Sequence, residues 1–140
     1  MIAYLDTSAL VKLYVKEAGS AAVRTACDHA KALATSRLSY VEAHAAAARR
    51  AREGDLSQKA GAQLAENLER DWPRYAVVEV TEVVCSVAVE LVGRHPLRGA
   101  DAVQLASALF LRQSSGQPIL FLCFDERLVA AAQGEGLAVA

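Results

Sequence analysis

The sequence predicts an α/β fold built around a mainly parallel sheet. Short apolar runs alternate with longer helical patterns along the chain, and several boundaries between them carry an acidic residue. Strands that alternate with helices are typical of parallel sheets, because two parallel strands need a crossover segment between them. With 140 residues, of which 54% are hydrophobic, the chain can bury a core, and we expect a single domain over residues 1–140.

Four apolar runs have the composition of β-strands. The first ends at Asp6, and a run that includes Leu33 is short. The last is the most apolar run in the sequence, which indicates a strand buried on both faces of a sheet. The expected strands cover residues 2–5, 33–35, 76–80 and 119–124, and a short tail over 137–139 closes the domain.

Helical periodicity and local start and stop signals place the helices between these strands. Gly19 ends the first helix, and Ser39 with Glu42 has the spacing of a capping box that starts the third. Pro73 stops the fourth, and Gly99 opens the sixth, whose apolar residues follow the i, i+3, i+4, i+7 pattern. The expected helices cover residues 7–15, 20–32, 39–53, 58–71, 83–94, 101–113 and 126–133.

Composition and charge narrow the range of functions only slightly. A formal net charge of −1 and a pI near 6.3 give no overall basic signature, so composition alone does not indicate a nucleic-acid-binding protein. No apolar stretch approaches the roughly 18 to 20 residues of a membrane span. Cys27, Cys85 and Cys123 are widely spaced without a CxxC pair, and we expect buried free thiols in a reducing cytoplasm.

Four acidic residues stand where apolar segments pass into helices. Asp6 and Asp125 end the first and last long apolar runs, and Glu42 and Asp101 lie in the expected first turns of two alanine-rich helices. The strand-to-helix turns of a parallel sheet gather at one edge, so residues that are distant in sequence can meet there. We therefore expect the four carboxylates to share a cleft.

Each acid also has a purely structural interpretation. Glu42 fits the third helical position of a capping box, Asp125 fits an N-cap, and Asp101 fits a first-turn acid favoured by the helix dipole, each worth about 0.5 to 2 kcal/mol. Asp6 is harder to explain in this way. It follows a strand at its carboxyl end, where open α/β sheets bind ligands.

The acids taken as a set indicate a metal site. Two like charges about 4 Å apart repel by about 4 kcal/mol at an effective dielectric constant near 20, so clustered carboxylates must take up protons or hold a cation. Oxygen ligands without a histidine or cysteine partner favour Mg²⁺ or Mn²⁺ over Zn²⁺. Such an ion can activate water and stabilise a phosphodiester under attack. The predicted reaction is phosphodiester hydrolysis.

Four short segments surround these acids, at residues 4–10, 39–43, 97–106 and 124–128. In their order and spacing they resemble the PIN-domain ribonucleases, in particular the VapC-type toxins of prokaryotic toxin–antitoxin pairs. The resemblance spans almost the whole chain. It implies a PIN-like three-layer α/β/α fold and a type II toxin that cleaves RNA, usually dimerises, and is inhibited by an antitoxin whose C-terminal segment lies across the acidic cleft.

The same resemblance assigns roles to particular residues. It implies that Asp6, Glu42, Asp101 and Asp125 are the metal-binding and catalytic acids of a Mg²⁺- or Mn²⁺-dependent endoribonuclease.

Residues beside the acids complete this assignment. Thr7 or Ser8 matches the position that often supports the first acid by hydrogen bonding. Two residues before the last acid, Cys123 stands where the family often has serine or threonine, so the support of Asp125 departs from the family pattern.

Basic and aromatic residues supply candidates for RNA contact. Arg49 follows Glu42 by seven residues and shares its helical face, and Arg98 precedes Asp101 by three residues, so each can neutralise a phosphate. Lys12 is a further candidate, whereas an ordinary solvated helix face is the better interpretation for three other basic residues, Lys16, Arg50 and Arg52. The aromatic residues Tyr40, Trp72 and Tyr75 are expected to pack, with a base-stacking platform as the alternative.

Two other classes of protein remain open. A haloacid dehalogenase-like phosphate-transfer enzyme also begins with a strand that ends in aspartate, but it needs a second aspartate two residues later, where this chain has Ser8. A non-catalytic PIN-like binding module would keep the fold and lose an acid, and here all four are present.

Overall fold

Five parallel strands form the single sheet of the protein, for which a computed structural model describes residues 1–140. The strand order is β3-β2-β1-β4-β5, and every neighbouring pair is parallel. The strands are β1 (Ile2–Leu5), β2 (Ala32–Ser36), β3 (Ala76–Val78), β4 (Ile119–Leu122) and β5 (Ala138–Val139). The expected α/β class with a parallel sheet is confirmed.

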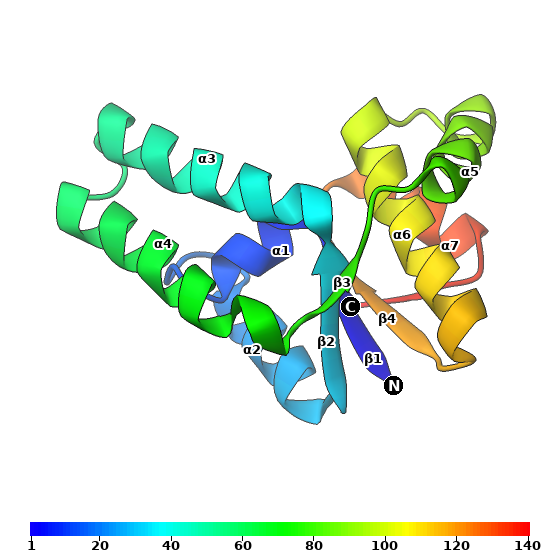
Figure 1. Ribbon diagram of the computed structural model, residues 1–140, viewed down its shortest axis with the longest axis horizontal. Helices are drawn as coiled ribbons and strands as arrows, with labels where there is room; N and C mark the ends of the chain where they lie inside the picture. The colour runs from blue at the N-terminus through cyan, green and yellow to red at the C-terminus, as the bar shows by residue number, and fades with distance from the viewer.

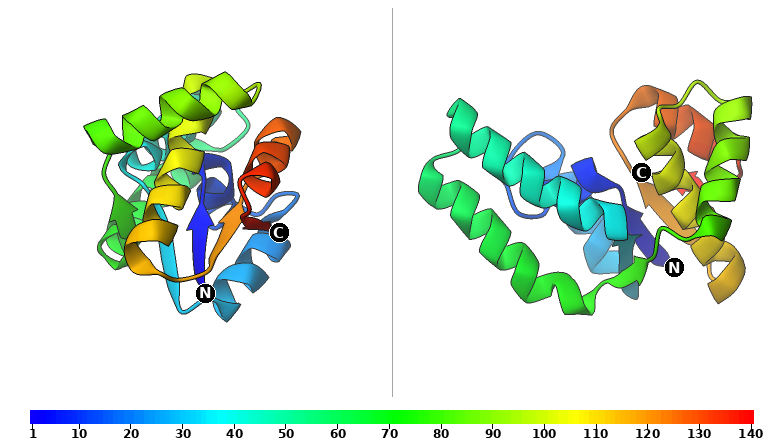
Figure 2. Two further views of the ribbon diagram at one scale, coloured as in Figure 1. Left: turned by 90° about the vertical axis from the view of Figure 1, so that its right-hand side faces the viewer. Right: turned by 45° about the horizontal axis from the view of Figure 1, so that its top comes forward.

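Helices cover both faces of this sheet (Figure 1). They are α1 (Thr7–Lys12), α2 (Ser20–His29), α3 (Arg37–Glu53), α4 (Gln58–Asp71), α5 (Glu82–Arg94), α6 (Gly99–Ser115) and α7 (Glu126–Gly134), with a 3₁₀ turn at Trp72–Arg74. α1 to α4 lie on one side and α5 to α7 on the other, which gives three layers (Figure 1). Figure 2 shows α3 and α4 as a long antiparallel hairpin that projects beyond the sheet.

The alternating side chains of the central strands explain why two helical layers form. In β1, Ile2 and Tyr4 belong to the core shared with α5, α6 and α7, whereas Ala3 and Leu5 belong to the core shared with α1 to α4. Successive residues of a strand point to opposite faces, so a strand that is apolar at every position needs cover on both. β1 is buried along its whole length, as this requires.

The start of α3 differs from the prediction. Ser36, not Ser39, is the N-cap, and its Oγ accepts from the Leu38 backbone N at 3.1 Å. Ser39 lies inside the first turn and is fully buried, so the expected capping box is wrong. Glu42 consequently stands in the second turn of α3 rather than the first.

The sheet has a topological switch point between β1 and β4. The chain passes from β1 outward to β2 and β3, and later adds β4 and β5 on the other side of β1. Crevices at such points, outside the carboxyl ends of the strands, are where open α/β sheets bind ligands. Asp6 directly follows β1 at this edge, and Asp125 lies three residues beyond the end of β4.

The cysteines are all free, but not all buried. Cys123 is buried, Cys27 is partly buried and Cys85 is exposed, so the expectation of burial is wrong for Cys85. None of the helices combines the length and apolar character that crossing a lipid bilayer requires.

Candidate active site

One cleft at the switch point contains all four predicted acids. It has a volume of about 440 Å³ and lies at the carboxyl edge of β1 and β4, bordered by α1, α3 and α6. Its acidic lining residues include Asp6, Glu42, Asp101 and Asp125. Side chains from four distant parts of the sequence therefore meet there because the parallel sheet brings its strand-to-helix turns together.

Asp6 is the innermost of these acids, with only 7% of its surface exposed. It caps α1, since its Oδ1 accepts from the Ala9 backbone N at 2.9 Å and from Ser8 Oγ at 2.7 Å. Burial raises the pKa of Asp6 to about 6; the two hydrogen bonds oppose this rise, and the charges of Asp101 and Glu42 add to it. A buried carboxylate beside two others is a site that a cation would stabilise.

Glu42 reaches the cleft from the second turn of α3. Its Oε1 accepts a hydrogen bond of 2.5 Å from Thr7 Oγ1, at the start of α1. Thr7 and Ser8 therefore serve different acids: Ser8 donates to Asp6, and Thr7 donates to Glu42.

Asp101 and Asp125 are the other two acids that line the cleft. Asp101 lies in the first turn of α6, and its Oδ2 is 3.5 Å from Nε of the exposed Arg98. Asp125 caps α7, with its Oδ1 accepting from the backbone N of Arg127 and of Leu128. Cys123 forms no hydrogen bond with Asp125, and burial together with the charges of Asp6, Asp125 and Asp101 raises the pKa of its thiol to about 12.

The four carboxylates share the cleft without forming a closed ligand cluster. No group of three or more histidine, cysteine, aspartate or glutamate side chains is close enough to hold an ion between them. Each acid instead bonds to a neighbouring hydroxyl, backbone amide or arginine, as expected for like charges that repel one another. The donor set consists of carboxylate oxygens, with hydroxyls in support, and this chemistry fits Mg²⁺ or Mn²⁺.

Gln104 of α6 lines the cleft and is the centre of a buried network of neutral polar side chains, which we call the floor. Gln104 Oε1 accepts from Tyr4 Oη at 2.7 Å, and its Nε2 donates to Thr7 Oγ1 at 3.2 Å and to Ser39 Oγ at 3.0 Å. Burial raises the pKa of Tyr4 above its usual range, so this hydroxyl stays protonated and donates.

The network has a single consistent direction. An ionised Glu42 can only accept, so Thr7 must use its one proton toward Glu42 and must therefore accept from Gln104. This fixes the orientation of the Gln104 amide, with its oxygen toward Tyr4. Gln104 thus orients Thr7, and Thr7 orients Glu42.

Reasoning from the sequence missed Gln104. It follows Asp101 by three residues and so lies on the same side of α6, next to the apolar stripe that includes Leu105. That position was the available signal, because a glutamine bordering a buried stripe needs polar partners. Its partner Tyr4 is 100 residues away in the chain, which no local pattern could show.

Basic side chains line the same cleft. Arg49, Arg50 and Arg98 border it together with Lys12. Arg50 Nη1 and Lys12 Nζ lie 3.2 and 3.5 Å from Glu17, so Arg50 is not the plain solvated side chain we expected.

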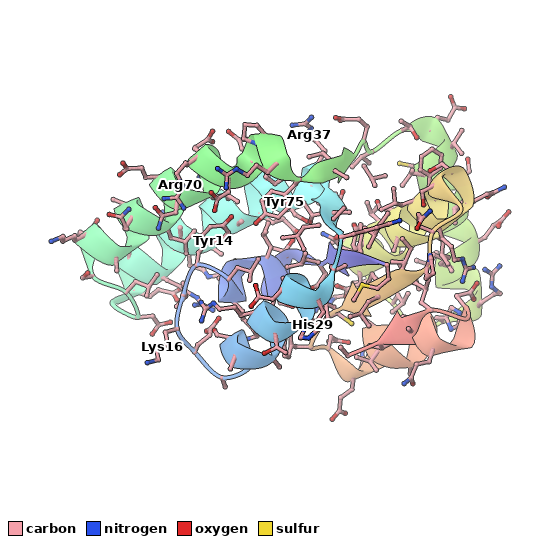
Figure 3. The ribbon with its side chains drawn as sticks, turned by 90° about the horizontal axis from the view of Figure 1, so that it is seen from below. Tyr14, Lys16, His29, Arg37, Arg70 and Tyr75 are labelled. Carbon is pink, nitrogen blue, oxygen red and sulfur yellow. The ribbon has the colours of Figure 1, made fainter.

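Two basic residues and the clustered aromatics lie elsewhere. Lys16 is an exposed residue of the loop between α1 and α2 (Figure 3), and neither it nor Arg52 lines the cleft. Trp72 packs against Tyr40 and Tyr75, with ring centroids 4.9 and 5.7 Å apart. Tyr75 and Tyr14 point toward each other (Figure 3), with their hydroxyls 2.6 Å apart. None of these aromatic residues lines the cleft.

Comparison with known proteins identifies relatives of this fold. The family model for the PIN domain matches residues 3–134. Ribonuclease VapC45 of Mycobacterium tuberculosis (strain CDC 1551 / Oshkosh) is 40% identical over 140 residues, covering 99% of this chain and 94% of the relative. A toxin–antitoxin complex from Klebsiella pneumoniae contains a chain that aligns with a TM-score of 0.71 at 16% identity, covering 99% of this chain and 95% of that one. FitAcB from Neisseria gonorrhoeae aligns with a TM-score of 0.70 at 20% identity, covering 99% and 96%.

Proposed function

The chain belongs to the PIN-domain family, and on that premise we propose that it is a Mg²⁺- or Mn²⁺-dependent endoribonuclease, the toxin of a type II toxin–antitoxin pair. The observation that supports this most strongly is the convergence of Asp6, Glu42, Asp101 and Asp125 in one cleft at the switch point of the sheet. The kinship with a ribonuclease over nearly the whole chain supports RNA as the substrate. One PIN domain would then occupy residues 1–140.

The residues of the cleft divide the chemical work. Asp6, Glu42, Asp101 and Asp125 would hold the divalent ion. When bound, such an ion supplies an activated water and neutralises charge that develops on a phosphodiester.

The residues around the acids would orient them and bind the RNA backbone. Ser8 and Thr7 keep Asp6 and Glu42 in position. Arg49 and Arg98 would neutralise phosphates of the strand on either side of the bond that is broken. Hydrolysis adds one water across a P–O bond and leaves one phosphate end and one hydroxyl end.

An assay with three arms tests this proposal. Purified protein is incubated with single-stranded RNA and Mg²⁺ or Mn²⁺, with a phosphomonoester under the same conditions, and with RNA plus a chelator. We expect RNA cleavage in the first arm alone. Phosphomonoester hydrolysis would support the haloacid dehalogenase alternative, although Ser8 supplies a hydroxyl where that mechanism needs a second carboxyl group. Activity in no arm would support a non-catalytic binding module.

Its partners follow from the same premise. We propose a cognate antitoxin that covers the cleft, supported by the solved relatives, one of which is a toxin–antitoxin complex.

A homodimer is supported by the exposed valines of α5, Val83, Val89 and Val92, and light scattering should give twice the chain mass. A monomer mass at all concentrations would contradict the dimer. An RNA substrate and three free cysteines support a cytoplasmic location.

A further inference from the structure

Phe124 is the one aromatic residue among the side chains that line the acidic cleft. It stands between the buried Cys123 and the acid Asp125, and 44% of its surface is exposed. Exposed large apolar side chains are unremarkable when they are scattered over a surface. An exposed aromatic ring inside a predominantly charged cleft is different, because a polar side chain would be better solvated there.

Gly19 and Lys12 both contact the ring. A Cβ added to Gly19 would lie 2.7 Å from Phe124 Cε1, so the ring packs directly on the backbone of this glycine, whose φ of +91° already disfavours other residues. The Lys12 ammonium group lies 4.7 Å from the ring centroid, within the range of a cation–π interaction. The packing fixes the ring in place and leaves its exposed portion available to a ligand.

The groups around the ring suit a nucleotide. Lys12, Arg50 and Arg98 line the same cleft; the exposed Arg98 can neutralise a phosphate, whereas Lys12 and Arg50 also contact Glu17. Asp125, one of the predicted metal ligands, is the next residue in the chain. A flat aromatic face beside cations is how proteins hold unpaired bases, because base–aromatic stacking tolerates any base while the cations follow the backbone. A base in a duplex is already stacked and would not be available.

We propose that Phe124 is a substrate-binding residue that stacks on an unpaired RNA base next to the phosphodiester that is cleaved. The proposal rests on the endoribonuclease function and adds a residue of this chain that would position the RNA strand. Stacking on Phe124 would place the adjoining phosphate over the acids, so the ring contributes to choosing which bond is broken.

RNA binding by a cleavage-deficient protein tests the proposal. In an Asp101→Asn background, affinity for a fluorescein-labelled single-stranded oligonucleotide is measured by anisotropy, and a 2-aminopurine base in the oligonucleotide reports stacking by quenching. Phe124→Leu and Phe124→Met should each bind roughly 10-fold more weakly and lose the quenching. Phe124→Trp and Phe124→Tyr should keep both, because they retain an aromatic face.

Phe110→Leu is the matched control. Phe110 is 38% exposed but lies on α6 outside the cleft, so its replacement should leave RNA affinity unchanged. Circular dichroism verifies that each variant is folded. If either Phe124→Leu or Phe124→Met fails to fold, the other is compared with the aromatic variants.

The proposal is overturned if the Phe124→Leu and Phe124→Met proteins bind RNA and quench 2-aminopurine as the parent does. It is also overturned if Phe124→Leu leaves RNA binding intact and abolishes inhibition by the antitoxin, since the ring would then serve a protein partner. Failure of the nuclease function itself appears differently. In that case the unsubstituted protein cleaves no RNA with either metal.

Discussion

The floor of the cleft and its rim, which consists of the four acids, differ in charge and in burial. The floor consists of neutral polar side chains, Tyr4, Ser39 and Gln104, which are almost completely buried and hydrogen-bonded to one another. No buried side-chain nitrogen or oxygen in the protein lacks a partner. Among the four acids of the rim, Asp6 is the most buried and has a raised pKa, and Asp125 is exposed.

This difference separates what stabilises the protein from what enables it to act. A buried donor or acceptor that loses its partner destabilises the folded state by about 1 to 3 kcal/mol, so the floor contributes to folding. Like charges held close together destabilise a protein without a cation, and such strain is retained where function needs it. Substitutions on the rim should therefore reduce activity without reducing stability. Substitutions on the floor should reduce stability, and they should also reduce activity where they remove the hydrogen bond to Thr7.

The largest expected effect is on the rim, at Asp101. Asp101→Asn removes a carboxylate from the cleft while preserving the size of the side chain, and we expect RNA cleavage to fall by about 10³-fold, which is about 4 kcal/mol. Thermal unfolding should occur at the same temperature as in the parent or slightly above it. Asp55→Asn, in the exposed turn between α3 and α4, is the control and should keep full activity. A fully active Asp101→Asn protein would refute the mechanism.

The second effect is the pH dependence of stability caused by Asp6. Its pKa is raised from 3.8 to about 6 in the folded protein, so the folded state holds this proton more tightly than the unfolded state does. Stability attributable to Asp6 is therefore fully present below about pH 4 and is lost as the pH rises through 6, by about 3 kcal/mol in total.

Urea unfolding with a chelator present measures this contribution. The difference in unfolding free energy between Asp6→Asn and the unsubstituted protein should grow in favour of the variant from pH 4 to pH 7. Taking the difference removes the effects of other titrating groups. A difference that stays constant over this range would show that the charge of Asp6 does not destabilise the folded protein.

The third effect concerns the floor. Gln104→Leu leaves the buried hydroxyl of Tyr4 without its acceptor, while Ser39 keeps its hydrogen bond from Thr35, and we expect a loss of about 2 kcal/mol in unfolding free energy. Cleavage should fall as well, by about 10- to 100-fold, because Thr7 is no longer oriented toward Glu42. Tyr4→Phe is the matched variant: it should also be destabilised, but it keeps the bond from Gln104 to Thr7 and most of the activity. Equal activity losses in the two variants would contradict the directed network.

The smallest effect separates the hydroxyl of Thr7 from its packing. Thr7→Val removes the 2.5 Å hydrogen bond to Glu42 with little change in shape, and cleavage should fall by about 10-fold. Thr7→Ser restores the hydroxyl and should recover most of the rate. If Thr7→Ser and Thr7→Val cleave RNA at the same rate in steady-state kinetics, the hydroxyl of Thr7 does not position Glu42.

Sequence reasoning succeeded where local signals decide the structure. The helix over 58–71 has the predicted bounds, because Ser57 caps it and Pro73 follows it. Asp6 and Asp125 were found because a strand followed by an acid is visible in the sequence itself.

It failed where distant partners decide. Two serines three residues apart could each have capped α3, and Ser36 does so because β2 extends to it, pairing with Val78 of β3. Gln104 has its role only through Tyr4 and Thr7, at the other end of the chain. Phe124 resembles the end of a buried strand until β4 is seen to stop at Leu122.

Calorimetric titration with Mn²⁺ tests the central claim most directly, since it measures the capture of an ion without requiring any RNA. The protein and its Asp55→Asn control should show saturable uptake, and Asp101→Asn and Asp6→Asn should show a loss of affinity of at least 10- to 100-fold. The four carboxylates do not form a metal site if the unsubstituted protein takes up no Mn²⁺. The same conclusion follows if both acid variants bind Mn²⁺ as tightly as the unsubstituted protein does.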